Sequence, residues 1–236
     1  MPTADQHIIR ELYTRPSSIT ARRNEVVAMP DPSGIVFVVD DDVSVRESLA
    51  PLIRSAGWKP EMFTSANDFL ARQRTTVPCC LVLDVSLPGL TGLELQQQLT
   101  QRTEMPIIFI TGYGDVPMSV KAMKAGAAEF LTKPFKDDVL LDAIHQAITR
   151  SREALRDASE MNALRARYET LTPREREVMA LVVSGRLNKQ VGGELGISEI
   201  TVKAHRGQLM RKMQADSLPG LVTMAAKLGV SPAPPS

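Results

Sequence analysis

The sequence predicts a doubly wound α/β domain with a five-stranded parallel sheet, followed by a small all-α domain. Three observations predict this fold class. Short apolar runs recur about every 25 residues between residues 35 and 131, helical patterns lie between these runs, and three closely spaced helical segments with capping signals occupy the C-terminal part. Strands that alternate with helices are typical of a parallel sheet with helices on both faces, built from right-handed crossovers.

The five expected strands are short runs rich in Val, Ile, Leu and Phe. Apolar runs of this length without polar alternation indicate strands that are covered on both faces. The runs are residues 35–39, 79–83, 106–110 and 128–131, with a weaker one at 59–63. Cys79 and Cys80 are adjacent within one of these runs, so we expect buried strand residues, not a disulfide framework or a four-ligand zinc site.

The expected helices follow from apolar residues at helical spacing between the strands. Patterns of this kind occupy residues 45–53, 93–99 and 120–124, and Gly126 closes the last of them. Pro51 falls inside the first pattern, where proline typically costs about 3 kcal/mol, so we expect a kink or an early helix end there.

Composition and charge narrow the class of protein. The 43% of hydrophobic and 23% of charged residues are those of a globular chain. Neither a run of roughly 18 apolar residues nor the apolar core of a secretion signal is present, which predicts a cytoplasmic protein without a membrane span.

Residues 171–236 carry 9 basic and 5 acidic residues, whereas residues 34–150 carry 11 basic and 14 acidic residues. This asymmetry is compatible with a regulatory domain attached to a nucleic-acid reader.

Polar side chains follow several of the expected strands. Asp40 and Asp41 come after the first strand, Asp84 after the third, Thr111 after the fourth and Lys133 after the fifth. The carboxyl ends of parallel strands meet at one edge of a sheet, and clustered carboxylates need a cation there, for which Mg²⁺ is suited. With the ion bound, one carboxylate can attack a phosphoryl group, and the threonine and the lysine can bind the phosphate oxygens.

Four motifs in order, VFVVDDD, VLDVSLPGLTGLEL, IFITGYGD and EFLTKPF, resemble the receiver domain of two-component response regulators, a flavodoxin-like fold. The resemblance covers about residues 35–150. It implies that Asp84 accepts the phosphoryl group. It also implies that Asp41, Asp84 and the main-chain carbonyl of Ser86 hold Mg²⁺, with Asp40 acting mainly through water.

The same resemblance implies a switch around the phosphorylated aspartate. In the family, a threonine after the fourth strand moves toward the phosphate and an aromatic residue three positions before the lysine turns inward. In this chain these residues are Thr111, Phe130 and Lys133. The bond between Lys133 and Pro134 is often cis in the family, and such a bond is permitted at small cost before proline.

The C-terminal part predicts a helix-turn-helix after a helical connection. Residues 137–168 lack Pro and Gly and read as one helix, of which 151–166 is the expected linker. Thr172 and Glu175 form a capping box for the next helix. Further helices are expected over residues 188–195 and from the Ser198 cap to about residue 213, separated by a turn that contains glycine.

The last of these helices has an apolar side, which includes Val202 and Leu209, and an opposite polar side. We expect the polar side to face the major groove of DNA. Its members are Lys203, Ala204, Gly207, Gln208 and Arg211. Residues at the edges of this side are better placed to contact DNA phosphates. Such contacts fix the position of the protein on the DNA but do not distinguish one base from another. These are Lys189, Thr201, His205 and Lys212.

Arg206 points nearer the apolar side of this helix, and two alternatives stay open: a contact with DNA, or a pair with an acid of the first helix of the domain. Gly192 and Gly193 lie inside the preceding helix, where a close helix crossing accounts for one glycine and leaves the other unexplained.

Residues 167–232 resemble the LuxR-type helix-turn-helix of the NarL/FixJ class of regulators, in LTPREREVMALVVSG and NKQVGGELGISEITVKAHRGQLMRKM. Together the resemblances imply a transcriptional regulator that a sensor histidine kinase phosphorylates. The expected partners are double-stranded promoter DNA with two-fold half-sites, RNA polymerase, and a second copy of the chain once it is phosphorylated. Beyond phosphorylation and slow dephosphorylation of itself, we expect no enzyme activity.

The expected domain organisation has five parts. They are an extension at residues 1–33, the receiver at 34–150, the linker at 151–166, the DNA-binding domain at 167–232 and a tail at 233–236. The extension is either a disordered arm or a false start, with translation beginning at Met29.

Two other functions share some of these sequence features with a phosphorylated transcriptional regulator. The first is a receiver and helix-turn-helix regulator that acts without phosphate, against which the complete acidic pocket argues. The second is a phosphohydrolase of the haloacid dehalogenase type, which also uses aspartate after a first strand, then a threonine and a lysine. That alternative gives Asp84 no role, and Ser44 stands where those enzymes carry Thr or Val.

Overall fold

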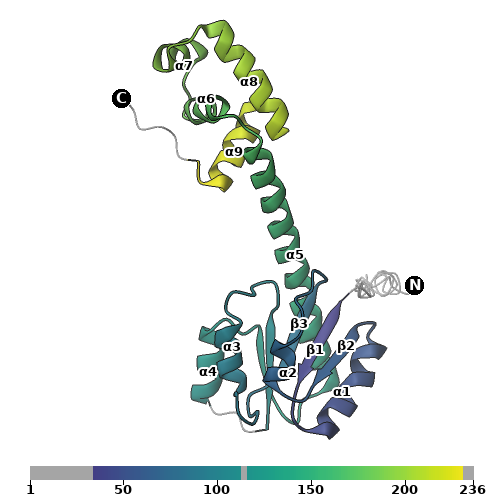
Figure 1. The fold of residues 1–236 in the computed structure, drawn as a ribbon. Helices are drawn as coiled ribbons and strands as arrows, with labels where there is room; N and C mark the ends of the chain where they lie inside the picture. The colour runs from purple at the N-terminus through teal and green to yellow at the C-terminus, as the bar shows by residue number, and fades with distance from the viewer. Residues whose placement is uncertain (1–33, 113–115, 231–236) are drawn as a thin grey trace, which may run out of the picture. The chain divides into compact units, whose positions relative to one another are not determined.

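The computed structural model describes residues 34–112 and 116–230. The first part contains a parallel sheet of five strands in the order β2-β1-β3-β4-β5 (Figure 1). The strands are β1 Ile35–Val39, β2 Lys59–Phe63, β3 Cys79–Asp84, β4 Ile107–Thr111 and β5 Glu129–Thr132. The predicted fold class is confirmed, and each strand begins and ends within one residue of its expected bounds.

Alternation along the central strands divides the core into two layers, one on each face of the sheet. Phe37 of β1 and Leu81 of β3 lie side by side on one face, and Val38 and Val82 lie side by side on the other. All residues of β1, β3 and β4 are buried, which explains why these strands lack polar alternation. Cys79 is a buried free thiol, as predicted, and burial raises its pKa to about 11.

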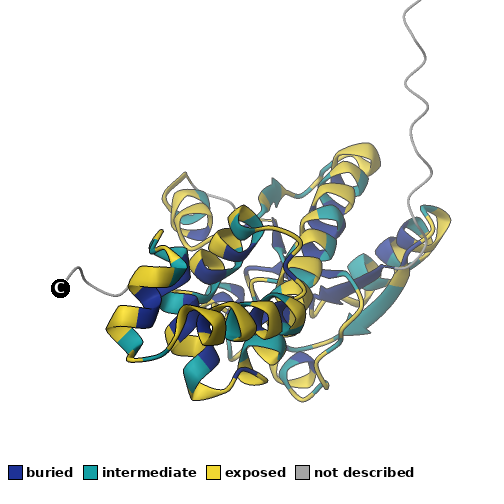
Figure 2. Cartoon of the chain, turned by 90° about the horizontal axis from the view of Figure 1, so that it is seen from above, coloured by how far each residue is buried: buried dark blue, intermediate teal, exposed yellow. Residues whose placement is uncertain are grey.

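Five helices accompany the sheet in the described residues. They are α1 Val43–Ser55, α2 Ala66–Leu70, α3 Gly92–Gln98, α4 Val116–Lys124 and α5 Asp137–Glu169. Each contains both buried and exposed residues, and Figure 2 shows helices with dark blue and yellow on different sides. α1 continues past Pro51 to Ser55. Of the two outcomes expected at this proline, the early helix end is therefore wrong, and the kink stays a prediction. α2 lies where the sequence shows no clear helical pattern.

α5 contributes to two separate cores. Leu140, Ile144 and Ile148 pack against the sheet, and Leu164 belongs to the core of the C-terminal helices. Between them, the buried hydroxyl of Ser151 accepts from the backbone N–H of Cys79 at 2.9 Å and donates to a backbone carbonyl of the loop before β4. This hydroxyl fixes α5 to the amino end of β3. The expectation of one helix over residues 137–168 is confirmed.

The C-terminal part consists of α6 Pro173–Val183, α7 Asn188–Leu195, α8 Glu199–Met213 and α9 Leu218–Leu228. The capping box of Thr172 and Glu175 begins α6 as predicted, and the Ser198 hydroxyl caps α8. Gly196 ends α7 with a φ of 67°, a left-handed conformation that glycine adopts at low cost.

One of the paired glycines in α7 is explained by packing. A Cβ at Gly192 would lie 2.7 Å from the carbonyl oxygen of Ile197, so α7 and the turn after it approach too closely for a side chain. A Cβ at Gly193 would meet nothing within 4 Å, and nothing in the structure explains that glycine.

Residues 1–33 and 231–236 lie outside the described residues, and so do the expectations about the N-terminal extension, the last two residues of the DNA-binding domain and the tail. Within the described ranges, every helix is too short or too polar to cross a membrane.

Candidate functional site

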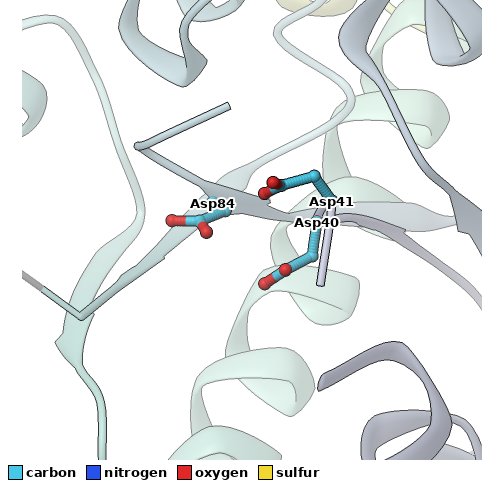
Figure 3. A group of neighbouring side chains, drawn as sticks. All are labelled: Asp40, Asp41 and Asp84. Atoms are coloured by element: carbon cyan, nitrogen blue, oxygen red, sulfur yellow. The ribbon is translucent and has the colours of Figure 1, made fainter. Parts of the chain in front are cut away.

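Three aspartates meet at the carboxyl ends of β1 and β3. β1 and β3 run parallel with Val39 beside Leu83, so the residues that follow on each strand are neighbours. One carboxylate oxygen from each of Asp40, Asp41 and Asp84 lies within 4.8 Å of the others, and Figure 3 shows the three side chains grouped at this edge. The predicted convergence of these carboxylates is therefore present.

The three carboxylates differ in environment. Asp40 has no exposed surface, Asp84 is 7% exposed and Asp41 is exposed. Burial raises the pKa of Asp40, and the neighbouring Lys133 only partly offsets this effect. The Asp41 carboxylate accepts no hydrogen bond from any described residue, so its oxygens are available to a ligand.

Lys133 joins the cluster from the end of β5. Its Nζ lies 2.7 Å from Oδ2 of Asp40 and 3.4 Å from Oδ2 of Asp84. Burial alone would lower the pKa of Lys133, but the hydrogen bond and charge of Asp40 outweigh burial and raise it. The peptide bond to Pro134 is cis, as the resemblance implied.

Thr111 and Phe130 flank the cluster on β4 and β5. Thr111 is fully buried, one residue beyond Ile110, which pairs with Asp84 across the sheet. The backbone carbonyl of Thr111 accepts from the N–H of Lys133 at 2.7 Å. The Phe130 ring lies 6.1 Å from that of Phe109 and is half-buried.

Two neighbours of the cluster were not found by sequence reasoning. A Cβ on Gly92, the first residue of α3, would lie 2.3 Å from the carbonyl oxygen of Asp84, so only glycine fits there. Arg46 of α1 donates from Nη1 to the carbonyl oxygen of Asp40 at 2.6 Å. A glycine after a turn and an arginine on a helix carry no sequence signal for these contacts, because both depend on tertiary packing.

The donor set fits a hard divalent cation. Three carboxylates within reach of one point offer oxygen ligands, one of them free of hydrogen bonds from the described residues and open to solvent. Mg²⁺ prefers such a set because it keeps part of its water shell. The Oδ1 atom of Asp84 accepts from the backbone N–H of Ser86 at 3.2 Å, which orients this carboxylate at the rim of the cluster.

The two sides of α8 are separated as the sequence predicts. Val202, Leu209 and Met213 are fully buried in the core of the C-terminal helices. The predicted groove-facing residues, all exposed, are Lys203, Ala204, Gly207, Gln208 and Arg211. Lys203 also forms an exposed ion pair of 3.4 Å with Glu199, one turn earlier.

The predicted flanking residues have different surroundings. Lys189 and Thr201 are exposed, and His205 is half-exposed. Lys212 instead donates to Oε2 of Glu175 at 2.6 Å and to the carbonyl oxygen of Thr170 at 3.2 Å.

Arg206 was expected to contact either DNA or an acid of α6, the first helix of the C-terminal domain, and it binds a different residue of that domain. It donates from Nη1 to Oδ1 of Asn188 at 3.0 Å, so the expected pair with an acid of the first helix is not formed.

Comparisons with known proteins agree with this geometry. Residues 36–145 match the model of the response regulator receiver domain, and residues 169–225 match that of bacterial regulatory proteins of the luxR family. Nodulation protein W of Bradyrhizobium diazoefficiens is 51% identical over 84% of this chain and 87% of that protein. The transcriptional regulatory protein FixJ of Rhizobium meliloti is 44% identical over 84% and 97%. The solved structure of the response regulator StyR, 48% identical, superposes with a TM-score of 0.75 over 83% of this chain and 99% of that one.

Proposed function

Because this chain belongs to the response regulators that combine a receiver domain with a LuxR-type helix-turn-helix, and is therefore a phosphorylation-dependent DNA-binding transcriptional regulator, we propose specific roles for the residues of its two sites. Asp84 accepts the phosphoryl group, Asp40, Asp41 and Ser86 complete the metal site, and α8 reads DNA. The family is one of DNA-binding regulators, and it gives no support to a phosphohydrolase.

The choice of Asp84 as acceptor rests on the differences among the three carboxylates. Asp40 is fully buried and accepts a 2.7 Å hydrogen bond from Lys133, so it offers no exposed surface to a phosphoryl donor. Asp41 is exposed and lies off the end of the sheet. Asp84 is oriented by the Ser86 N–H and faces the ammonium of Lys133 at 3.4 Å. This orientation is the single observation that carries the assignment.

The chemistry is transfer of a phosphoryl group to a carboxylate. An oxygen of Asp84 attacks phosphorus of the kinase phosphohistidine, the P–N bond breaks, and the histidine nitrogen keeps the electron pair and takes up a proton. Asp41, Asp84 and the carbonyl of Ser86 would hold a Mg²⁺ ion, with Asp40 acting mainly through water, and the bound ion would supply the positive charge that offsets repulsion between the two anions. The ammonium of Lys133 and the hydroxyl of Thr111 bind oxygens of the transferred group.

Phosphorylation then shifts a population of conformations. Phe109 and Thr111 are two residues apart on β4 and therefore project from the same face of the sheet, and Phe130 of β5 pairs with Phe109. We propose that movement of the threonine toward the phosphoryl oxygens frees space beside this aromatic pair. We propose that inward rotation of Phe130 changes the surface of the receiver, promotes pairing of two copies and permits contact with RNA polymerase.

For DNA binding we propose two sets of contacts. Lys203, Gln208 and Arg211 reach base edges from the exposed side of α8, where Ala204 and Gly207 permit close approach. Lys189, Thr201 and His205 contact phosphate. Arg206 and Lys212 already have partners within the domain, and their contacts with DNA are secondary.

The test measures phosphorylation and DNA binding in one set of proteins. The full-length chain is incubated with labelled acetyl phosphate and Mg²⁺, and its affinity for selected DNA is measured with and without the donor. We expect Asp84→Asn to lose both the label and the gain in affinity, whereas Asp42→Asn keeps both. Asp42 is the matched control because it caps α1 through Ser44 and lies outside the three-carboxylate cluster. Retention of both by Asp84→Asn would refute the assigned role.

A further inference from the structure

A large apolar side chain is exposed at the start of α8. Ile200 is 80% exposed, the highest value among the large hydrophobic residues of the described chain. The other residues that open this helix have recognisable roles. Ser198 is the N-cap, Glu199 pairs with Lys203, and Ile197 and Val202 pack in the domain core on either side of the cap. Ile200 takes no part in this packing.

The position of Ile200 on the helix is the middle of the proposed DNA-reading side. At about 100° per residue, Ile200 lies roughly 20° from Gly207 and Arg211 and roughly 40° from Ala204 around the helix axis. Val202, on the buried side, lies roughly 160° away. Ile200 therefore projects from the same side as the residues proposed to enter the major groove, one turn nearer the amino end than Ala204.

The surroundings of Ile200 favour DNA as the partner over an apolar protein surface. The side chains that share its side of α8 are small or cationic, Ala204, Gly207 and Arg211, and all are exposed. An apolar protein partner would find no second large hydrophobic residue on this side of the helix. A base pair offers one apolar group in the major groove, the C5 methyl of thymine.

We propose that Ile200 contacts a thymine methyl in each half-site and makes the protein prefer thymine at that position. This inference rests on the proposed function of α8 and adds a specificity-determining residue to the polar side chains assigned there. Contact with the methyl removes apolar surface of both groups from water. The contact therefore discriminates thymine from cytosine, which lacks the methyl, and from uracil, which differs from thymine only in it.

The replacement of thymine by uracil tests this contact without changing any hydrogen bond. The phosphorylated full-length protein is first used to select its binding sequence from random double-stranded DNA. Each thymine of one half-site is then replaced in turn by deoxyuridine, and Kd is measured. For one position we expect a loss of about fourfold, the value for removal of one buried methyl group.

Protein variants complete a double-mutant cycle at that position. Ile200→Ala should bind thymine-containing DNA more weakly than the wild type and should no longer distinguish thymine from uracil. Ile200→Val, which keeps two methyl groups, should retain part of the discrimination. Val77→Ala, an exposed apolar truncation in the receiver, should leave the fourfold difference intact.

The outcomes separate this inference from the proposed function. Equal discrimination by the wild type and Ile200→Ala, or no uracil effect at any position, would refute the contact while sequence-specific binding itself stands. Failure to select any sequence, or equal loss of affinity for all DNA in Arg211→Gln and Lys203→Gln, would count against α8 as the reading helix instead. Circular dichroism of Ile200→Ala checks that α8 is intact, as expected because alanine favours helix and the replaced side chain is exposed.

Discussion

The ammonium of Lys212 on α8 lies 2.6 Å from Oε2 of Glu175 on α6, and the carboxylate is almost completely buried. The same Glu175 oxygen accepts from the backbone N–H of Thr172 at 2.8 Å and completes the capping box of α6. One carboxylate thus caps the start of α6 and pairs with a lysine near the end of α8, the proposed recognition helix. This arrangement fixes α8 against the scaffold of the domain.

The first prediction concerns the stability of the helix-turn-helix. Lys212→Met should lower the free energy of opening α6 and α8 by about 1–2 kcal/mol, because it leaves the buried Glu175 carboxylate without its charged partner. Hydrogen exchange at the amides of both helices in the full-length protein measures this change. Lys203→Met is the matched control: its pair with Glu199 is exposed on both sides, so exchange should hardly change. Equal effects of the two variants would contradict a structural role for Lys212.

The second prediction is the pH dependence of the same pair. Burial alone would raise the pKa of Glu175, but the hydrogen bonds from Lys212 and Thr172 outweigh burial and hold it below its usual value. A depressed pKa contributes stability that is present above the unfolded-state value of about 4.3 and is lost as the pH falls through the folded-state value. The exchange difference between the wild type and Glu175→Gln should therefore be constant near neutral pH and decrease below about pH 4.3. A difference that grows with acidity would have the wrong sign.

The third prediction separates cations that contact phosphate from cations that hold the fold. Each phosphate contact adds about 0.9 to the slope of log Kd against log salt concentration. Lys189 is exposed at the start of α7, so Lys189→Gln should reduce this slope by about one unit. Lys212→Gln should change it by much less, since the ammonium already binds Glu175 and Thr170. Titrations between 50 and 200 mM salt, roughly the range over which such slopes are resolved, compare the two variants.

Much of the sheet was predictable because its signal is local. The central strands are buried on both faces, so their sequences contain uninterrupted apolar runs, and the polar residues at their ends follow at fixed positions. The sequence alone therefore places Asp40, Asp84 and Lys133 at one edge of the sheet. α2 was not predicted because it has only five residues, which are too few to show a repeating helical pattern of apolar residues.

Contacts that depend on tertiary packing were not predictable in the same way. Nothing near Ser151 in the sequence indicates that its hydroxyl bridges the loop before β4 and the start of β3. Lys212 was assigned to phosphate because it flanks the polar side of α8, and only the folded chain places Glu175 beneath it. Ile200 was not predicted because hydrogen-bonding and small residues carry the sequence signal for DNA contact, whereas its exposure becomes evident only when the core is known.

The fourth prediction tests the close approach of α3 to the acceptor strand. Gly92→Ala places a Cβ that would lie 2.3 Å from the Asp84 carbonyl oxygen, so the backbone at residues 84–85 must move. A misplacement of about 1 Å can cost 100-fold in rate, and we expect phosphorylation by acetyl phosphate to slow about 10- to 100-fold. Gly193→Ala is the matched control, because its Cβ meets nothing within 4 Å and the rate should not change. An unchanged rate in Gly92→Ala would show that the turn before α3 relaxes freely.

The fifth prediction concerns removal of the metal. Chelation of divalent ions should abolish labelling of Asp84, and added Mg²⁺ should restore it, because two anions cannot approach without a cation between them. Asp41→Asn removes a charged ligand whose oxygens have no other partner among the described residues, so half-maximal labelling should need roughly tenfold or more Mg²⁺. Asp42→Asn should keep the wild-type requirement, since the side-chain oxygen of Asp42 is engaged by the N–H and hydroxyl of Ser44. Equal shifts in both variants would mean that overall negative charge, not ligation by Asp41, sets the affinity for the ion.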